Sequence, residues 1–322
     1  MKNPVAEVRA HAPDGVPEVD AGDDLVTLLL AVADLADGDV VAVTSKVVSK
    51  AEGRVRAGTR EESLAGETDR IVARRGPTSI VRTRHGLTLA AAGIDASNVD
   101  AGRVVLLPED PDVSARALRQ AIHERTGRNV AVVVTDTAGR AWREGQTDIA
   151  IGAAGLRVLE SYAGRVDAHG NSLAVTAPAV ADEVAGVAEL AQGKLGARPF
   201  AVVRGRPDLV LPPGDDGPGA AALIRPDGAD MFGYGSREAV LAALRADPAD
   251  AAPFGQPVSA DELVAVLGGL PGAGRPYPDG ETVRCAPDPG ARGAVVAAAF
   301  AYGWVTVGPD GAAEVRFQPV TP

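Results

Sequence analysis

The sequence predicts an α/β fold, in which strands buried on both faces alternate with amphipathic helices. Two valine-rich runs, residues 40–43 and 130–134, have the composition of strands that helices cover on both sides. Apolar residues recur at helical spacing over residues 23–36 and 114–126. Polar clusters follow both valine runs, and ligands of α/β sheets bind where such strands end.

Further elements follow from the same patterns in chain order. Residues 67–75 are predicted to form a weak helix. In the helix at 114–126, Ser114 is the expected N-cap and Gly127 the expected C′ residue. Other strands are predicted at residues 88–92, 104–107, 173–177 and 200–203, and another helix at 180–192.

The chain is too long for one compact core, which predicts two domains. It has 322 residues, and a stretch rich in Pro, Gly and Asp at 212–219 is the expected linker. We place the boundary after Gly235, giving a domain at 1–235 and a small α+β accessory domain at 236–322. In the second domain, helices are predicted at 237–245, 261–267 and 294–302, and a hairpin from 304–307 and 313–317.

Composition excludes several classes of partner. The net charge is −11, which disfavours nucleic acid, because a phosphate backbone selects a basic surface. The single cysteine, Cys285, cannot form an internal disulfide, so we expect the reducing cytoplasm. No run of about eighteen apolar residues occurs, so no membrane span is predicted. The four histidines are scattered and none has zinc-ligand spacing.

The first polar cluster carries two lysines. Thr44, Ser45 and Lys46 follow the first valine run, and Lys50 comes four residues later. On a helix the two ammonium groups would share a face and repel unless an anion such as a polyphosphate bridged them. A solvated lysine pair is the alternative. The cluster is not a Walker A loop, because no GxxxxGK[ST] pattern is present.

Two further polar clusters each carry a carboxylate. Asp95 lies in a loop after a run of small residues, and Asp136 lies between two threonines after the second valine run. The two could converge on one Mg²⁺ or Mn²⁺ bound to phosphates, with Arg140 and Arg143 close behind to hold an anion. Ordinary polar turns are the alternative for both clusters.

Five stretches together resemble one known family. They are VTSKVVSKAEGR (43–54), AAAGIDASNV (90–99), TDTAGRAWREGQTDIAIGAAG (135–155), ADEVA (181–185) and QGKLGARPFAVVRG (192–205). These motifs resemble the coenzyme F420-0:L-glutamate ligase family, γ-glutamyl ligases that build the tail of a deazaflavin coenzyme. The resemblance covers about residues 5–235 and is closest to the actinobacterial form, in which a nitroreductase-like flavin domain follows the ligase domain.

The resemblance implies a family-specific α/β fold of mixed sheets and helices, an intertwined homodimer, and use of GTP with Mg²⁺ or Mn²⁺. It implies that Asp95 and Asp136 bind a first cation, with Thr137 near a second; Lys194 stands where some relatives have a carboxylate for that second ion. It implies contacts to phosphate or substrate from Arg140, Arg143 and Asp148. The GTP contacts that it implies are Val16, Pro17, Glu18, Val19, Ser45, Lys46, Lys50, Asn98, Gln192, Gly193 and Lys194.

The implied reaction is GTP-dependent ligation of L-glutamate to coenzyme F420-0 through an acyl phosphate, with γ-linked glutamates added in later rounds. No side-chain nucleophile is needed, which agrees with the lack of a nucleophile motif. Two alternatives stay open: a metal-dependent phosphohydrolase acting on a nucleotide, and a non-catalytic GTP-binding subunit. Residues 236–322 are too few for a complete nitroreductase-like domain, so no flavin is expected.

Overall fold

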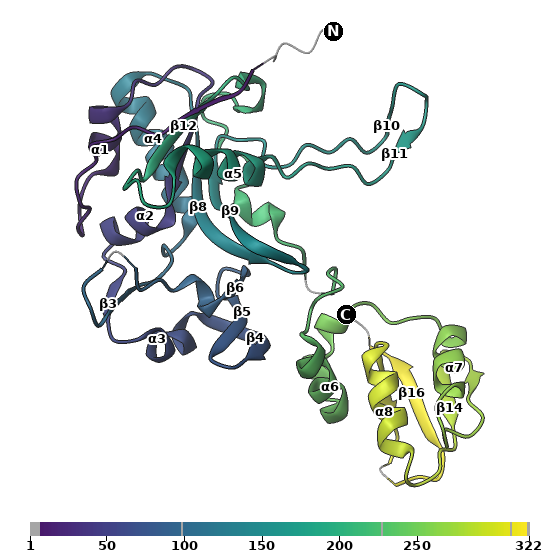
Figure 1. Ribbon diagram of the computed structural model, residues 1–322. Helices are drawn as coiled ribbons and strands as arrows, with labels where there is room; N and C mark the ends of the chain where they lie inside the picture. Colours follow the sequence, from purple (N-terminus) through teal and green to yellow (C-terminus); the bar gives the residue numbers. More distant parts are fainter. Residues whose placement is uncertain (1–6, 98, 227, 310, 321–322) are drawn as a thin grey trace. The chain divides into compact units, whose positions relative to one another are not determined.

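The computed structural model describes residues 7–97, 99–226, 228–309 and 311–320. The chain divides into two compact units (Figure 1). The first holds Met1–Arg70 and Ile80–Ile224, and the second holds Ile71–Ser79 and Arg225–Pro322. The division after residue 224 precedes the boundary that we expected after Gly235, and the second unit also takes in a short early segment. The predicted α/β class is confirmed, because both units combine helices with a sheet.

A five-stranded mixed sheet forms the centre of the first unit. Its strand order is β1-β12-β2-β8-β9, and only β2 and β8 are parallel. The valine runs form β2 and the first half of β8, and both are buried as their composition predicts. The strands are β1 (Arg9–His11), β2 (Val40–Thr44), β8 (Ala131–Arg140), β9 (Arg143–Ala154) and β12 (Phe200–Arg204).

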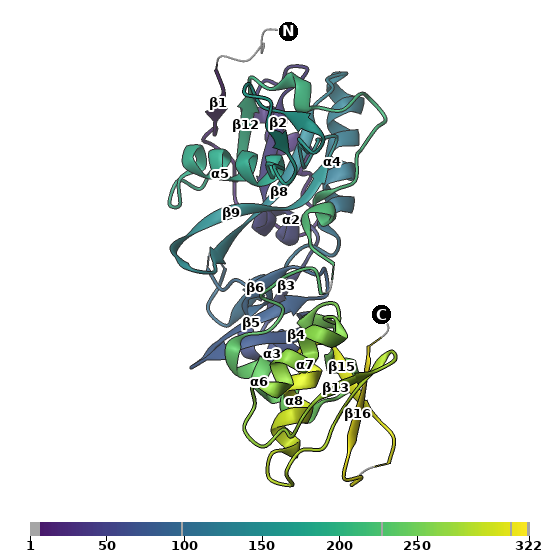
Figure 2. The same cartoon turned by 90° about the vertical axis from the view of Figure 1, so that its right-hand side faces the viewer.

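Helices cover both faces of this sheet, which explains the continuous apolar runs. Val132 and Val134 pack in a core with α1, α2 and α4, whereas Ala131 and Val133 pack in a second core with α5. Figure 2 shows α4 and α5 on opposite sides of the sheet. The helices are α1 (Leu25–Val32), α2 (Ser45–Ala51), α4 (Pro111–Thr126) and α5 (Val180–Gln192).

Smaller sheets accompany the five-stranded one. The weak helix predicted at 67–75 is wrong: α3 (Arg60–Glu67) ends there, and β4 (Thr68–Arg75) pairs in a three-stranded sheet with order β4-β5-β6. The charged residues of this segment mask the alternation of apolar and polar side chains that indicates a strand, and its pairing in the sheet determines its structure. The other elements are β3 (Val55–Ala57), β5 (Thr78–Thr83), β6 (Thr88–Ala90), β7 (Arg103–Val105), β10 (Arg165–Val166) and β11 (Ser172–Leu173), with the 3-10 turns η1 (Ala91–Gly93), η2 (Pro207–Leu209) and η3 (Ala220–Leu223).

The segment around β10 and β11 is a narrow two-stranded arm that projects from the first unit (Figure 1). The strand predicted at 173–177 is therefore mostly wrong, because pairing covers only Ser172–Leu173. Val166 and Val175 are exposed on the arm. No core lies beside them, so their apolar character does not extend the strand.

Two predictions around α4 also need correction. The helix begins at Pro111 with Asp110 as its N-cap, not at Ser114, whereas Gly127 ends it in the left-handed conformation as predicted. The expected linker at 212–219 is held in place by the buried Arg119. The Arg119 guanidinium donates to the carbonyls of Leu211, Pro212 and Asp215 and to the carboxylate of Asp216.

The second unit is a small α+β body around one sheet of order β13-β14-β16-β15. The predicted hairpin is confirmed, since β15 and β16 pair antiparallel. Cys285 is buried in its core, and this burial raises the pKa of its thiol to about 11. Its elements are α6 (Ser236–Arg245), α7 (Ala260–Gly268), α8 (Arg292–Ala301), β13 (Tyr277–Asp279), β14 (Thr282–Cys285), β15 (Trp304–Val307), β16 (Val315–Pro319), η4 (Pro248–Asp250) and η5 (Ala252–Phe254).

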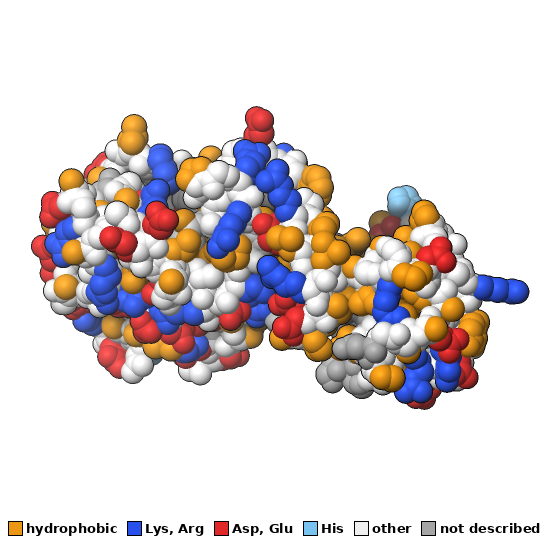
Figure 3. Space-filling view, turned by 90° about the horizontal axis from the view of Figure 1, so that it is seen from below, with side chains coloured by type: hydrophobic (Ala, Val, Ile, Leu, Met, Phe, Trp, Pro, Cys, Tyr) orange, Lys and Arg blue, Asp and Glu red, His pale blue; other side chains and the backbone are white. Residues whose placement is uncertain are grey.

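The surface agrees with the acidic composition. On the face drawn in Figure 3, the described Lys and Arg side chains are interspersed with Asp and Glu and do not collect into one basic patch. No helix in the described ranges has the length and apolar character needed to cross a membrane.

Candidate active site

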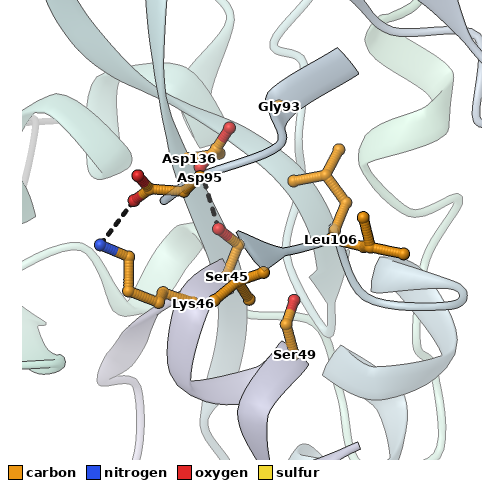
Figure 4. A pocket seen from close by; sticks show the side chains of 9 residues that line it. Ser45, Lys46, Ser49, Gly93, Asp95, Leu106 and Asp136 are labelled. Atoms are coloured by element: carbon orange, nitrogen blue, oxygen red, sulfur yellow. Dashed lines mark hydrogen bonds and ion pairs between the residues drawn. The ribbon is translucent and has the colours of Figure 1, made fainter. Parts of the chain in front are cut away.

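The parallel pair β2 and β8 positions the first group of polar side chains. Thr44 lies opposite Thr135 in the register, so Ser45, the first residue of α2, lies beside Asp136. The Ser45 Oγ donates a hydrogen bond of 2.9 Å to Asp136 Oδ1 (Figure 4). The segment 135–137, however, is not a loop after the strand as expected. A register shift after Val134 is followed by further pairing with β9, so Asp136 belongs to β8 itself.

Asp95 reaches the same place from a different part of the chain. It follows η1 and forms an isolated bridge with Val105, which fixes its backbone. Its carboxylate lies 2.6 Å from Lys46 Nζ and accepts hydrogen bonds of 2.8 Å from the backbone and hydroxyl of Ser97. Burial alone would raise the pKa of Asp95, but the hydrogen bonds from Lys46 and Ser97 outweigh it and lower the pKa to about 2.

The two carboxylates line one pocket. Figure 4 shows both side chains beside α2, with Asp95 turned toward Lys46 and Asp136 toward Ser45. Burial, followed by the charges of Asp148 and Asp95, raises the pKa of Asp136 to about 7 despite the hydrogen bond from Ser45. The Ser49 Oγ in the same pocket is buried, and no described residue hydrogen bonds to it. The remaining lining residues are Ser45, Lys46, Gly93, Val105, Leu106 and Leu107.

These observations fit a hard divalent cation between Asp95 and Asp136. Two converging carboxylates repel each other, and a cation with oxygen ligands would relieve that repulsion. The described residues contain no group of three or more His, Cys, Asp and Glu side chains placed to hold a metal ion. The carboxylate pair is the candidate cation site because both residues line one pocket, and Lys46 is the adjacent fixed positive charge.

Thr137 belongs to a different cluster. Its hydroxyl donates to Asp148 Oδ1 at 2.7 Å and accepts from Lys194 Nζ at 2.9 Å. Asp148 is buried, and its second oxygen accepts the Thr135 hydroxyl at 3.1 Å. Successive side chains of a strand point to opposite faces, so this cluster lies on the face of β8 away from Asp136. The Thr137 hydroxyl is thus shared between Asp148 and Lys194, and its predicted place near a second cation stays a prediction.

Lys50 and the segment at 16–19 form another contact. The Lys50 ammonium is paired with the carboxylate of Glu18. Lys50 has a side-chain exposure of only 9%, whereas Glu18 is 74% exposed. Val19 is buried in the first core, with Val16 packed against it. The segment Val16, Pro17, Glu18 and Val19 is thus anchored beside α2. Lys46 and Lys50 each face a carboxylate.

The other predicted residues lie farther from the pocket or outside the description. Arg140 and Arg143 are exposed, and they lie opposite each other in the strand register at the tip of the β8–β9 hairpin. Gln192 is buried at the end of α5, and Gly193 caps that helix with a φ of 65°. Asn98 lies outside the described residues.

Three polar residues of the site have no role that was predicted from the sequence. Ser97 binds Asp95, and its place two residues after an aspartate is a known turn pattern that could have revealed it. Ser49 lies one helical turn after Ser45, which is also visible in the sequence. Arg60 Nη2, at 3.5 Å from Asp95 Oδ1, comes from α3 and carries no such signal.

Comparisons with known proteins agree with this architecture. The family model described as F420-0:Gamma-glutamyl ligase matches residues 15–62 and 59–205. The coenzyme F420:L-glutamate ligase of Methanothermobacter thermautotrophicus is 39% identical over 246 residues, which are 68% of this chain and 96% of that protein. The enzyme of the same name from Archaeoglobus fulgidus is 40% identical over 219 residues, 62% of this chain and 88% of that protein.

The first unit and these matches define the class: the chain is a ligase that forms amide bonds. More narrowly, it belongs to the F420-0:γ-glutamyl ligase family. This confirms the resemblance found in the five sequence motifs. The matched residues, 15–62 and 59–205, include every residue that lines the Asp95–Asp136 pocket.

Proposed function

We propose that this protein ligates L-glutamate to coenzyme F420-0 in F420 biosynthesis, using GTP and Mg²⁺ or Mn²⁺, and that it works as a homodimer. The observation that carries the metal and nucleotide part is the pocket in which Asp95, Asp136 and Lys46 converge. Relatives that carry the name coenzyme F420:L-glutamate ligase support the choice of substrates.

The proposed reaction has two steps. A carboxylate oxygen of the phospholactyl arm attacks the γ-phosphorus of GTP; a new O–P bond forms, the bond to the β-phosphate oxygen breaks, and GDP leaves. The amine of L-glutamate then attacks the acyl carbon of this acyl phosphate. A C–N bond forms, the C–O bond to phosphate breaks, and the nitrogen loses a proton. Later rounds would use the γ-carboxylate of the growing tail.

The protein contributes position and charge. Asp95 and Asp136 would hold a divalent cation, which when bound neutralises phosphate charge. Lys46 is fixed by Asp95 and Ser97, so its ammonium stays at the pocket without the entropy loss of ordering a free side chain. Lys50 faces an exposed carboxylate that an incoming phosphate could replace. Positioning of this kind suffices for phosphoryl transfer without a side-chain nucleophile.

Mass spectrometry of F420-0 incubated with the protein, GTP, Mn²⁺ and L-glutamate tests the proposal. We expect glutamyl additions and equivalent release of GDP. Phosphate release from GTP without any glutamyl product would favour a phosphohydrolase, and GTP binding without turnover would favour a non-catalytic subunit. Either result would overturn the ligase assignment.

Two variants test the cation pair. Asp136→Asn and Asp95→Asn each replace an anionic ligand by a neutral amide of similar size, and we expect each to lower turnover by about a hundredfold or more. Asp208→Asn, which removes an exposed carboxylate paired with Arg206, is the matched control and should retain turnover. Near-normal turnover of either site variant at saturating Mn²⁺ would remove that residue from the site.

A further inference from the structure

The Thr137 hydroxyl could bind a cation, but it already makes hydrogen bonds to Asp148 and Lys194. Its proton goes to Asp148 Oδ1 at 2.7 Å, and the Asp148 carboxylate is held in turn by Thr135 at 3.1 Å. A carboxylate only accepts, so the direction of the Thr137 O–H is fixed. The oxygen lone pairs therefore point away from Asp148, and one of them accepts Lys194 Nζ at 2.9 Å.

The main chain around Lys194 supports this placement. Gly193, at the end of α5, adopts a φ of 65°, and the N–H of Gly196 donates to the carbonyl of Gly193, which makes Lys194 part of a tight turn. One helical turn earlier on α5, the Glu189 carboxylate accepts the backbone N–H of Asp148. The end of α5 therefore holds both the Asp148 backbone and the turn that carries Lys194.

A lysine ammonium and a metal ion compete for the same hydroxyl. A divalent ion bound through the Thr137 oxygen would lie within a few ångströms of Lys194 Nζ, and two cations at that separation repel. Lys46 differs from Lys194, because it is paired with Asp95 at the pocket on the opposite face of β8. The Lys194 ammonium thus already places a positive charge beside the Thr137 hydroxyl.

We propose that Lys194 acts as a built-in cation at the Thr137–Asp148 cluster, so that this protein binds one divalent ion per chain, between Asp95 and Asp136, and not two. This inference rests on the proposed function and adds to it that a nucleotide phosphate reaches the Thr137–Asp148 cluster as well as the Asp95–Asp136 pocket. Lys194 then contacts phosphate directly with its ammonium. It is a nucleotide-positioning residue, and the proposed change in binding needs no covalent step.

Counting bound Mn²⁺ tests the proposal. The full chain, with one equivalent of a non-hydrolysable GTP analogue, is titrated with Mn²⁺ while electron paramagnetic resonance follows the free ion. We expect one bound ion in the wild type and two in Lys194→Glu, where a carboxylate joins Thr137 and Asp148. Leu195→Glu is the matched control. It adds the same charge at the neighbouring residue, which is 97% exposed, and should still bind one ion.

Any other number of bound Mn²⁺ ions, in the wild type or in Lys194→Glu, overturns the inference. Two ions in the wild type would mean that Lys194 does not exclude the second one. One ion in Lys194→Glu would mean that the Thr137–Asp148 cluster is no cation position at all. No bound ion in the wild type would also remove the metal from the proposed function, which the two preceding results leave intact.

A second variant gives an independent reading. Lys194→Gln keeps the length of the side chain and removes the charge. We expect the affinity for the GTP analogue, measured by calorimetry at constant Mn²⁺, to fall about tenfold or more, as for loss of a charge-assisted hydrogen bond to phosphate. Unchanged affinity would contradict direct contact between Lys194 and phosphate.

Discussion

The two ends of β8 treat their polar groups in opposite ways. At its start, the buried Arg119 donates hydrogen bonds to the carbonyl of Val130, to Asn129 and to the segment 211–216, so its donors are well matched to acceptors. At the other end, Asp136 shares a pocket with Asp95 and has a pKa raised to about 7 by burial and by neighbouring carboxylates. At the first end the donors of Arg119 are hydrogen bonded within the protein, whereas at the second end no cationic side chain among the described residues offsets the raised pKa of the Asp136 carboxyl.

This difference teaches where to look for function in the unit. A buried polar group that is fully hydrogen bonded adds to the definition of the fold, whereas one left under-compensated costs stability and is retained where a ligand completes it. The following changes should therefore lower stability at the Arg119 end and lower function at the Asp136 end.

Arg119→Met should have the largest effect on stability. It would leave several buried carbonyl oxygens without donors and release the segment 211–216, which we expect to cost about 3–5 kcal/mol of unfolding free energy. Chemical denaturation monitored by circular dichroism measures this loss. Arg116→Met, on the same helix and partly exposed, is the control and should cost less than about 1 kcal/mol. Equal effects in the two variants would refute the special position of Arg119.

Lys50→Ala should affect binding more than folding. Lys50 is nearly buried but faces an exposed glutamate, so its charge is available to a phosphate. We expect the affinity for GTP to fall by about 1.5–3 kcal/mol, as for a charge-assisted hydrogen bond, with L-glutamate binding less affected. Calorimetric titration measures both affinities, and unchanged GTP affinity would rule out a phosphate contact by Lys50.

Asp136→Asn should make the metal-free protein more stable above neutral pH although it lowers turnover. The folded-state pKa of Asp136, about 7, lies above its unfolded value near 3.8, so folding favours the protonated form. Stability is then fully present below about pH 4 and is lost as the pH rises through about 7. The asparagine cannot ionise and escapes this loss.

We expect the variant and the wild type to melt at similar temperatures at pH 4. At pH 8 the variant should gain on the order of 1–2 kcal/mol, since Asp136 is partly exposed and solvent screens its charge. Scanning fluorimetry with a chelator present measures the difference. A gap that stayed constant between these pH values would show that ionisation of Asp136 does not destabilise the fold.

Ser49→Ala should have the smallest effect on stability. The Ser49 hydroxyl is buried beside the carboxylate pair, and no described residue hydrogen bonds to it. Its removal should change the unfolding free energy by less than about 1 kcal/mol, and in the stabilising direction, because an unsatisfied polar atom is lost. Loss of more than that amount in denaturation would show that the hydroxyl already has a partner in solution, such as an ordered water.

Much of the architecture could be predicted from the sequence because the central strands are buried on both faces. The apolar composition of residues 40–43 and 130–134 predicts buried strands, and these form β2 and part of β8. The helix α5 has the bounds predicted from the spacing of its apolar residues. The segment 67–75 is predicted as a helix because charged residues obscure the alternation of the strand at Thr68–Arg75. Its strand form depends on β5, which a local pattern does not reveal.

The candidate site shows the same limit. That Asp95 and Asp136 could converge followed from polar residues after apolar runs, and they line one pocket. The extension of β8 through Asp136 was missed, since threonine, aspartate and glycine also form turns. The contact of Lys194 with Thr137 joins residues 57 positions apart, and no local pattern encodes it.

The early segment Ile71–Ser79 has a consequence for the order of folding. The carbonyl of Val72 accepts the N–H of Gly235, and the N–H of Arg74 donates to Glu238, 164 residues later in the chain. At about 5–20 residues per second, this segment leaves the ribosome on the order of ten seconds or more before its partners do. During that interval it lacks these partners, although β4 can already pair with β5. The second unit therefore matures only once residues 225–322 have been made, well after its first piece, Ile71–Ser79.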